Sequence, residues 1–192
     1  MKQFEGFKSE ASSAGYPMLP KGLYIAGIQA VKVEGDEPDQ RLVIRLDIVE
    51  GPYTGYYTKR YQSDSQSGGR FEVKYKGDFR LQIPNQANSK RQHFDWDLRN
   101  FNGSIWAIED SNEGYHWDWN EAGLKGKFIG INVREGSYNG NPYTTIGRLE
   151  SVRMIRDGKC KVMKDLAPRG DAFEPAGSTA NAFVTVDEEV PF

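Results

Sequence analysis

Tyrosines and cationic side chains lie close together in the segment YYTKRYQ that begins at Tyr56, and this composition suits binding rather than bond making. Bases of single-stranded nucleic acid expose their π-faces to aromatic rings, while Lys and Arg neutralise the phosphates. If the segment is a strand, Tyr57, Lys59 and Tyr61 share one of its faces. We predict that this face contacts nucleic acid; the opposite face, with Tyr56 and Arg60, is the alternative.

A metal or acid–base site has to be considered at GYHWDWNEAG (114–123), which brings together His116, Asp118 and Glu121. The chain has only two histidines and one cysteine, Cys160, which are too few for a zinc site. It also lacks a P-loop, a nucleophile elbow and an H-E-x-x-H motif. We therefore expect neither an enzyme nor a bound cofactor, and we expect the two tryptophans to fold this loop back onto the domain.

Charge is distributed unevenly along the chain, although the net charge at neutral pH is only −2. Residues 57–92 carry eight Lys and Arg against three Asp and Glu, and residues 124–164 carry nine against three. Residues 165–192 are acidic, with six carboxylates and one Arg. The low net charge thus hides two cationic blocks that suit a polyanionic partner.

Alternating apolar and polar residues predict strands at 22–33 and 41–51, and a third strand at 56–62. In the second strand four apolar residues share one face, which we expect to pack in the core: Leu42, Ile44, Leu46 and Ile48. Arg45 then lies on the outer face, beside the third strand. The basic and aromatic segment 63–93 has no clear period, so we assign no element to it.

A helix over 95–112 is predicted by apolar residues that recur at spacings of four, three, four and three. They are Phe94, Leu98, Phe101, Ile105 and Ile108. Gly103 weakens the middle of this helix, because glycine is a poor helix former.

The pair Asn139-Gly140 is a strong hairpin signal and predicts flanking strands at 128–135 and 143–155. In the first of these strands we expect Ile129, Ile131 and Val133 to point inward. The residues expected to point outward are Phe128, Asn132 and Arg134, with Tyr138 and Tyr143 on either side of the turn. This hairpin is placed to close over a bound strand.

The predicted element order is three strands, a helix and two strands, which is the connectivity of the five-stranded Greek-key barrel called the OB-fold. We expect a mainly β domain over residues 22–166, preceded by an N-terminal extension of residues 1–21. Residues 167–192 are rich in Pro, Gly, Ala, Ser and Thr and have no apolar period, so we expect a disordered acidic tail.

The sequence ends in DEEVPF, a short acidic run followed by an apolar pair and an aromatic ring. Such carboxylates pair with Lys and Arg at the rim of a partner's pocket, and the ring fills its apolar floor. We predict that the last six residues dock onto a partner protein: Asp187, Glu188, Glu189, Val190, Pro191 and Phe192. An acidic tail that only improves solubility is the alternative.

The DEEVPF tip resembles the C-terminal tip of bacterial single-stranded-DNA-binding proteins, and the element order makes the chain similar to phage or mobile-element single-stranded-DNA-binding proteins with an OB-fold. The resemblance implies a protein that coats single strands of many sequences during replication or recombination. It also implies recruitment of replication or recombination proteins through the tail, and it leaves homo-oligomer formation open. The short linker departs from the family, since it lacks the Gly- and Gln-rich stretch common in bacterial relatives.

The expected DNA-binding residues are cationic or aromatic and come from the second and third strands, the following loop and the last hairpin. They are Arg45, Tyr57, Lys59, Arg60, Tyr61, Arg70, Lys74, Phe128, Arg134, Tyr138 and Tyr143. Arg70 and Lys74 rank behind the others, because charged runs are usually only solvated surface.

The chain has no apolar run long enough to span a membrane, and its first residues lack the apolar block of a signal peptide. We therefore expect a cytoplasmic protein without a membrane partner, in a bacterial host cell if a phage encodes it.

Two alternative functions remain open. One is a non-enzymatic carbohydrate-binding domain, and the other is a phage structural or interaction protein; neither would bind nucleic acid.

Overall fold

The computed structural model describes residues 16–67, 72–88 and 93–170. Within these ranges the chain forms five strands and four helices. The strands are β1 (Gly22–Glu34), β2 (Arg41–Ile48), β3 (Asp78–Gln82), β4 (Phe128–Tyr138) and β5 (Asn141–Glu150). The helices are α1 (Tyr56–Gln66), α2 (Phe94–Ser111), the 3₁₀ helix η1 (Glu121–Leu124) and α3 (Val152–Arg156), and the order along the chain is β1, β2, α1, β3, α2, η1, β4, β5 and α3. None of the helices in this part of the chain is long and apolar enough to cross a membrane.

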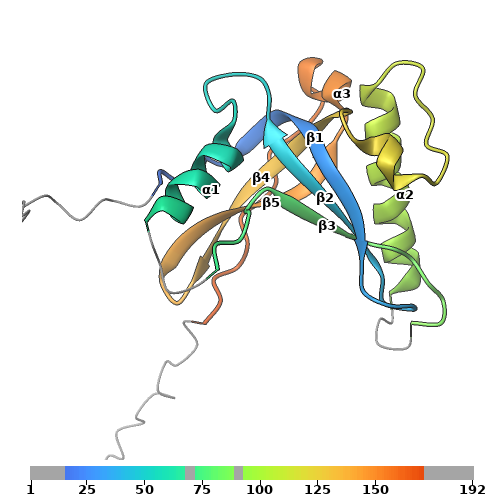
Figure 1. Cartoon of the computed structure of the whole chain (residues 1–192), viewed down its shortest axis with the longest axis horizontal. Coiled ribbons are helices and arrows are strands. Elements are labelled where there is room, and N and C mark those ends of the chain that lie inside the picture. Colours follow the sequence, from blue (N-terminus) through green and yellow to red (C-terminus); the bar gives the residue numbers. More distant parts are fainter. Residues whose placement is uncertain (1–15, 68–71, 89–92, 171–192) are drawn as a thin grey trace, which may run out of the picture.

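The strands form one sheet in the order β3-β2-β1-β4-β5, and every neighbouring pair is antiparallel. Strands β3 and β5 are the two edges of this sheet, so the closed barrel predicted from the element order is not formed. The protein is a mixed α/β domain instead. Helix α2 contacts β3, β4 and β5, whereas α1 contacts β2, and Figure 1 shows the two helices apart, with strands of the twisted sheet between them.

The core lies on one face of this sheet, as the alternation predicts. The apolar residues expected inside are all buried: Leu42, Ile44, Leu46, Ile48, Ile129, Ile131 and Val133. They form one cluster with Phe101 and Ile108 of α2. Burying such a side chain stabilises the fold by roughly 1.5–3 kcal/mol, so α2 is held mainly by its apolar face.

Helix α2 confirms the predicted helix within one residue at each end. Its buried residues are Asp97, Phe101, Ser104, Ala107 and Ile108, whereas Leu98 and Ile105 are only half-buried. The neighbouring stripe of the helix therefore stays exposed, and Gly103 lies within it without breaking the helix.

The third strand predicted at 56–62 is wrong, because this segment forms helix α1. Gly55 takes a left-handed conformation with φ 74° and turns the chain away from β2. The carboxylate of Asp47 then accepts hydrogen bonds from the backbone N–H of Tyr57 (3.0 Å) and Thr58 (3.2 Å) at the start of the helix. The third strand is β3, in the segment left unassigned above.

The predicted hairpin is confirmed, since β4 and β5 pair across a turn in which Asn139 and Gly140 both have positive φ, 49° and 74°. Its second strand is shorter than predicted and ends at Glu150. There Ser151 caps the start of α3, and its Oγ accepts a hydrogen bond from the backbone N–H of Met154 at 3.2 Å.

The predicted N-terminal extension contributes to the core through Leu19, which is buried and whose backbone N–H donates to the Tyr56 hydroxyl at 2.8 Å. In the predicted tail, Arg169 hydrogen-bonds with Ser137 and Asn139 of the last hairpin. The remainder of that tail, and with it the predicted disorder, lies outside the described residues.

Candidate functional site

Arg45 lies on the outer face of β2, as predicted, and faces Asp78 of β3. Its Nε and Nη2 donate to the two carboxylate oxygens of Asp78 at 2.9 and 3.1 Å, and this hydrogen-bonded carboxylate raises the pKa of Arg45. Its guanidinium also lies over the ring of Tyr75, 4.7 Å from the centroid. This geometry is a cation–π contact. Together with the two hydrogen bonds to Asp78, it fixes the position of the planar guanidinium.

Tyr75 joins Arg45 to a group of tyrosines on the outer side of the sheet. Its ring centroid lies 5.9 Å from that of Tyr61 and 6.3 Å from that of Tyr57. Its hydroxyl donates to the Leu46 carbonyl at 3.0 Å, and burial raises the pKa of Tyr75 to about 12. Tyr61 is the exposed ring of the group, with 41% of its surface accessible. We call Arg45, Tyr61 and Tyr75 the outer-face cluster.

Tyr57 does not belong to an open face, contrary to the prediction, because only 5% of its surface is accessible. Burial also raises its pKa, so the phenol stays neutral. Tyr56, from the alternative face, is buried too, and its hydroxyl donates to the Pro17 carbonyl at 2.8 Å. Both rings were assigned to a strand surface; the helix turns them into the core.

Two predicted cations, Lys59 and Arg60, lie on α1 and make local contacts. Lys59 Nζ donates to the carbonyl of Thr54 at 2.8 Å. Arg60 Nη1 donates to the Tyr56 hydroxyl at 3.3 Å, and its Nε lies 3.7 Å from a carboxylate oxygen of Asp64. The strand geometry that placed Lys59 beside Tyr61, and Arg60 on the opposite face, is therefore absent.

The cations of the outer sheet face are paired with carboxylates. Besides Arg45 with Asp78, these pairs are Lys32 with Glu34 (2.7 Å), Arg80 with Glu34 (3.8 Å) and Arg41 with Asp39 (3.5 Å). A polyanion on this face must displace these carboxylates or share the cations with them. The carboxylates also repel the polyanion, which weakens its attraction to the face.

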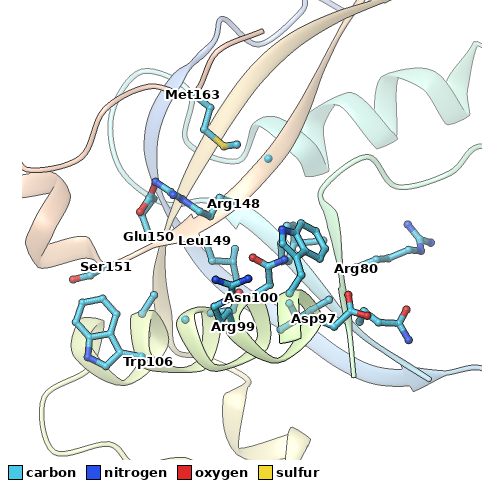
Figure 2. Close-up of a pocket in the computed structure, with 18 of the residues that line it drawn as sticks. Arg80, Asp97, Arg99, Asn100, Trp106, Arg148, Leu149, Glu150, Ser151 and Met163 are labelled. Atoms are coloured by element: carbon cyan, nitrogen blue, oxygen red, sulfur yellow. The ribbon is translucent and has the colours of Figure 1, made fainter. Parts of the chain in front are cut away.

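A larger concave surface lies where the sheet is open. We call it the seam cleft: a space of about 890 Å³ bounded by Phe79–Gln82 of β3, Gly147–Glu150 of β5 and one side of α2. Figure 2 shows Arg148 on β5 and Arg80 on β3, with Arg99 and Asn100 on the α2 ribbon below.

The seam cleft is cationic and partly aromatic. Its lining includes five arginines, namely Arg41, Arg80, Arg99, Arg134 and Arg148, but only two acids, Asp97 and Glu150. Both acids are buried. The indoles of Trp96 and Trp106 also line it and are 56% and 49% exposed.

Asn132 corrects another prediction, since it is fully buried rather than turned to solvent. Its amide donates to Glu150 Oε1 (3.0 Å) and to the Lys161 carbonyl (2.9 Å), and its Oδ1 accepts from the Met163 N–H (3.0 Å). The chain after α3 therefore covers this part of the sheet. The same Glu150 oxygen accepts from Arg148 Nε at 2.8 Å, which holds that guanidinium at the cleft.

The hairpin residues are not gathered in one place. Phe128 and Tyr138 are exposed at opposite ends of β4, which are roughly 30 Å apart at the rise of an extended strand. Tyr143 lies against Gly136 on the neighbouring strand. Of the residues predicted in this hairpin, Arg134 reaches the seam cleft, because Gly147 has no side chain to displace its Nε.

The remaining predicted residues are placed only in part. Lys74 is exposed beside Tyr75, whereas Arg70 and the tail residues Asp187–Phe192 lie outside the described residues. The loop with His116 folds back on α2, where the ring of Trp119 stacks on Phe101 with centroids 6.3 Å apart and lies tilted against Trp117 at 4.8 Å. Over 16–67, 72–88 and 93–170, no three His, Cys, Asp or Glu side chains are grouped as metal ligands.

Apart from Arg134, the tryptophans and arginines that line the seam cleft were not predicted from the sequence. A usable signal existed, since Trp96, Arg99, Gly103 and Trp106 recur at spacings of three, four and three, beside the apolar stripe of the same helix.

No protein-family model matches this chain, and no curated protein has a significantly similar sequence.

Proposed function

We propose that this protein binds single-stranded DNA with little sequence preference, during replication or recombination of a phage or mobile element, and recruits partner proteins through its acidic C-terminal tip. The outer-face cluster carries the proposal. It places the guanidinium of Arg45, the half-buried ring of Tyr75 and the exposed ring of Tyr61 together on one surface. These are the groups that bind phosphates and stack on unpaired bases.

The arrangement of the strands supports the same proposal. Strand β4 returns to lie beside β1 after the run β1-β2-β3, which is a Greek-key order. Pairing β3 with β5 would turn this sheet into a five-stranded barrel with a helix between its third and fourth strands. That is the architecture of the OB-fold, a partly open barrel that binds oligonucleotides on its second and third strands. Helix α1, inserted between β2 and β3, is a departure from it.

Binding of this kind has two separable terms. Stacking of one base on an aromatic ring contributes about 1–3 kcal/mol. Each phosphate neutralised by Lys or Arg lowers the slope of log K against log salt by about 0.7 for a single strand. Affinity for DNA should therefore fall steeply with salt, and the aromatic term should persist at high salt.

The test is a titration with oligothymidine at two salt concentrations, followed through the intrinsic fluorescence of tyrosine and tryptophan. We expect saturable quenching and tighter binding at the lower salt concentration. Tyr61→Ala should weaken binding, whereas Tyr61→Phe, which keeps the ring, should not. Absence of a complex at low ionic strength would overturn the proposal, and binding of a neutral oligosaccharide instead would favour a carbohydrate ligand.

A further inference from the structure

We propose that the seam cleft is a second contact surface for the same single strand, in which bases stack on Trp96 and Trp106 while the arginines bind phosphates. This inference rests on the proposed function and extends it to a surface made by α2 and the two sheet edges. It adds a binding site that neither the element order nor the outer face contains.

The tryptophans argue for a ligand with exposed π-faces. Both are about half exposed, although tryptophan is a largely buried residue in most proteins. Ten residues separate them on α2, which corresponds to about 15 Å along the helix axis and about 80° around it. Both rings therefore line one side of the helix, and a ligand that meets both must be elongated.

The space between the two tryptophans is open. Gly103 lies between them on the same stripe, and a Cβ at this position would have no heavy-atom neighbour within 4 Å. Glycine in the middle of a helix costs about 1 kcal/mol relative to alanine. No neighbouring atom requires this glycine, and its lack of a side chain leaves the cleft wide at this point.

The charge of the lining argues for a polyanion. Five arginines and two acids line the cleft, and three of these arginines have carboxylate partners: Arg41 with Asp39, Arg80 with Glu34 and Arg148 with Glu150. Among the ion pairs found within the described ranges, none involves Arg99 or Arg134. Arg99 donates its Nε to the carbonyl of Asp95 at 3.2 Å, which orients the guanidinium without neutralising it. Arg99 and Arg134 distinguish the cleft from the outer face, where the ion pairs found within the described ranges give Lys32, Arg41, Arg45 and Arg80 each a carboxylate partner.

An acidic peptide would also match this charge, but it offers no face to stack on the indoles unless it is aromatic. A strand of nucleic acid meets both requirements with every nucleotide. Since β3 borders both the seam cleft and the outer face, a single strand can pass over this edge from one surface to the other.

The first experiment removes the rings. The double variant Trp96→Ala/Trp106→Ala should bind oligothymidine about five- to a hundredfold more weakly for each ring that stacks. Trp119→Ala is the matched control, because this indole is 75% exposed but belongs to the loop after α2 and not to the cleft. It should bind as the unmodified protein does.

The second experiment fills the cleft without removing a ring. Gly103→Glu adds a side chain and a negative charge inside the cleft, and it also improves helix propensity, so it should not unfold the protein. Asn102→Glu adds the same charge at the adjacent exposed position, outside the lining. We expect Gly103→Glu to weaken binding at least tenfold more than Asn102→Glu.

The outcomes separate this inference from the proposed function. If the unmodified protein binds oligothymidine and the variants in Trp96, Trp106 and Gly103 bind equally well, the cleft is not a DNA site while the proposed function stands. If the unmodified protein binds no oligothymidine at low salt, both fail. Binding of an acidic peptide that the double variant loses, without any DNA binding, would make the cleft a peptide site and overturn the inference.

Discussion

Arg45 and Asp78 face each other across β2 and β3 and share two hydrogen bonds, of 2.9 and 3.1 Å, at the centre of the outer-face cluster. The carboxylate thus occupies the donors that a phosphate would use. Asp78 is an internal competitor of the proposed ligand, and removing its charge should reveal this.

We predict that Asp78→Asn binds oligothymidine more tightly, because it frees Arg45 and removes a negative charge from the face. Exposed ion pairs contribute about 0.2–1 kcal/mol, so the gain should be at most about fivefold. The control Glu113→Gln makes the same charge change at an exposed position after α2. A filter-binding assay at low salt distinguishes the two. Equal effects of both substitutions would show that only net charge matters.

We predict that Asp47→Ala destabilises the fold by about 2–3 kcal/mol, since one buried carboxylate accepts from three backbone N–H groups. The donors belong to Ile48, Tyr57 and Thr58, and two of them start α1. The free energy of unfolding in urea measures the effect. Asp64→Ala, which removes a partner of Arg60 on the same helix, should change it by less than about 0.5 kcal/mol. A small loss in Asp47→Ala would mean that α1 does not depend on this cap.

We predict that stability falls as the pH rises above about 10, the pKa of an unfolded tyrosine. Burial raises the pKa of Tyr57 and Tyr75, so the folded state keeps phenolic protons that the unfolded state loses. Their contribution is complete below about pH 10 and is lost as the pH rises through the folded-state values. Tyr57→Phe should flatten this decline, as measured by unfolding curves between pH 8 and pH 12. A decline that stays equally steep would assign the alkaline loss to other groups.

We predict that deleting the last six residues, Asp187–Phe192, tightens DNA binding and abolishes partner recruitment. The reason is the charge pattern: residues 165–192 are acidic and residues 124–164 are basic. We therefore expect the tail to compete with DNA for the Lys and Arg side chains. Oligothymidine titration and a pull-down with the tail peptide measure the two effects. Unchanged or weaker DNA affinity in the truncated protein would rule out the competition.

The sequence by itself determined the elements whose signals are local. The alternation in β2, the Asn139-Gly140 turn and the apolar stripe of α2 each involve neighbouring residues, so a period or a turn preference suffices to predict them. Arg45 could be placed on the outer face for the same reason, because a strand alternates its side chains.

The tertiary structure decided what depends on contacts distant in sequence. Seven residues with a period of two are too few to distinguish a strand from a helix. The segment 56–62 is a helix because the Asp47 carboxylate accepts hydrogen bonds from the N–H groups of Tyr57 and Thr58 at its start. The seam cleft likewise needs β3, β5 and α2 to meet, three elements that no local pattern relates. Whether a sheet closes into a barrel depends on whether its two edge strands pair with each other. The order of the strands along the chain does not determine this pairing.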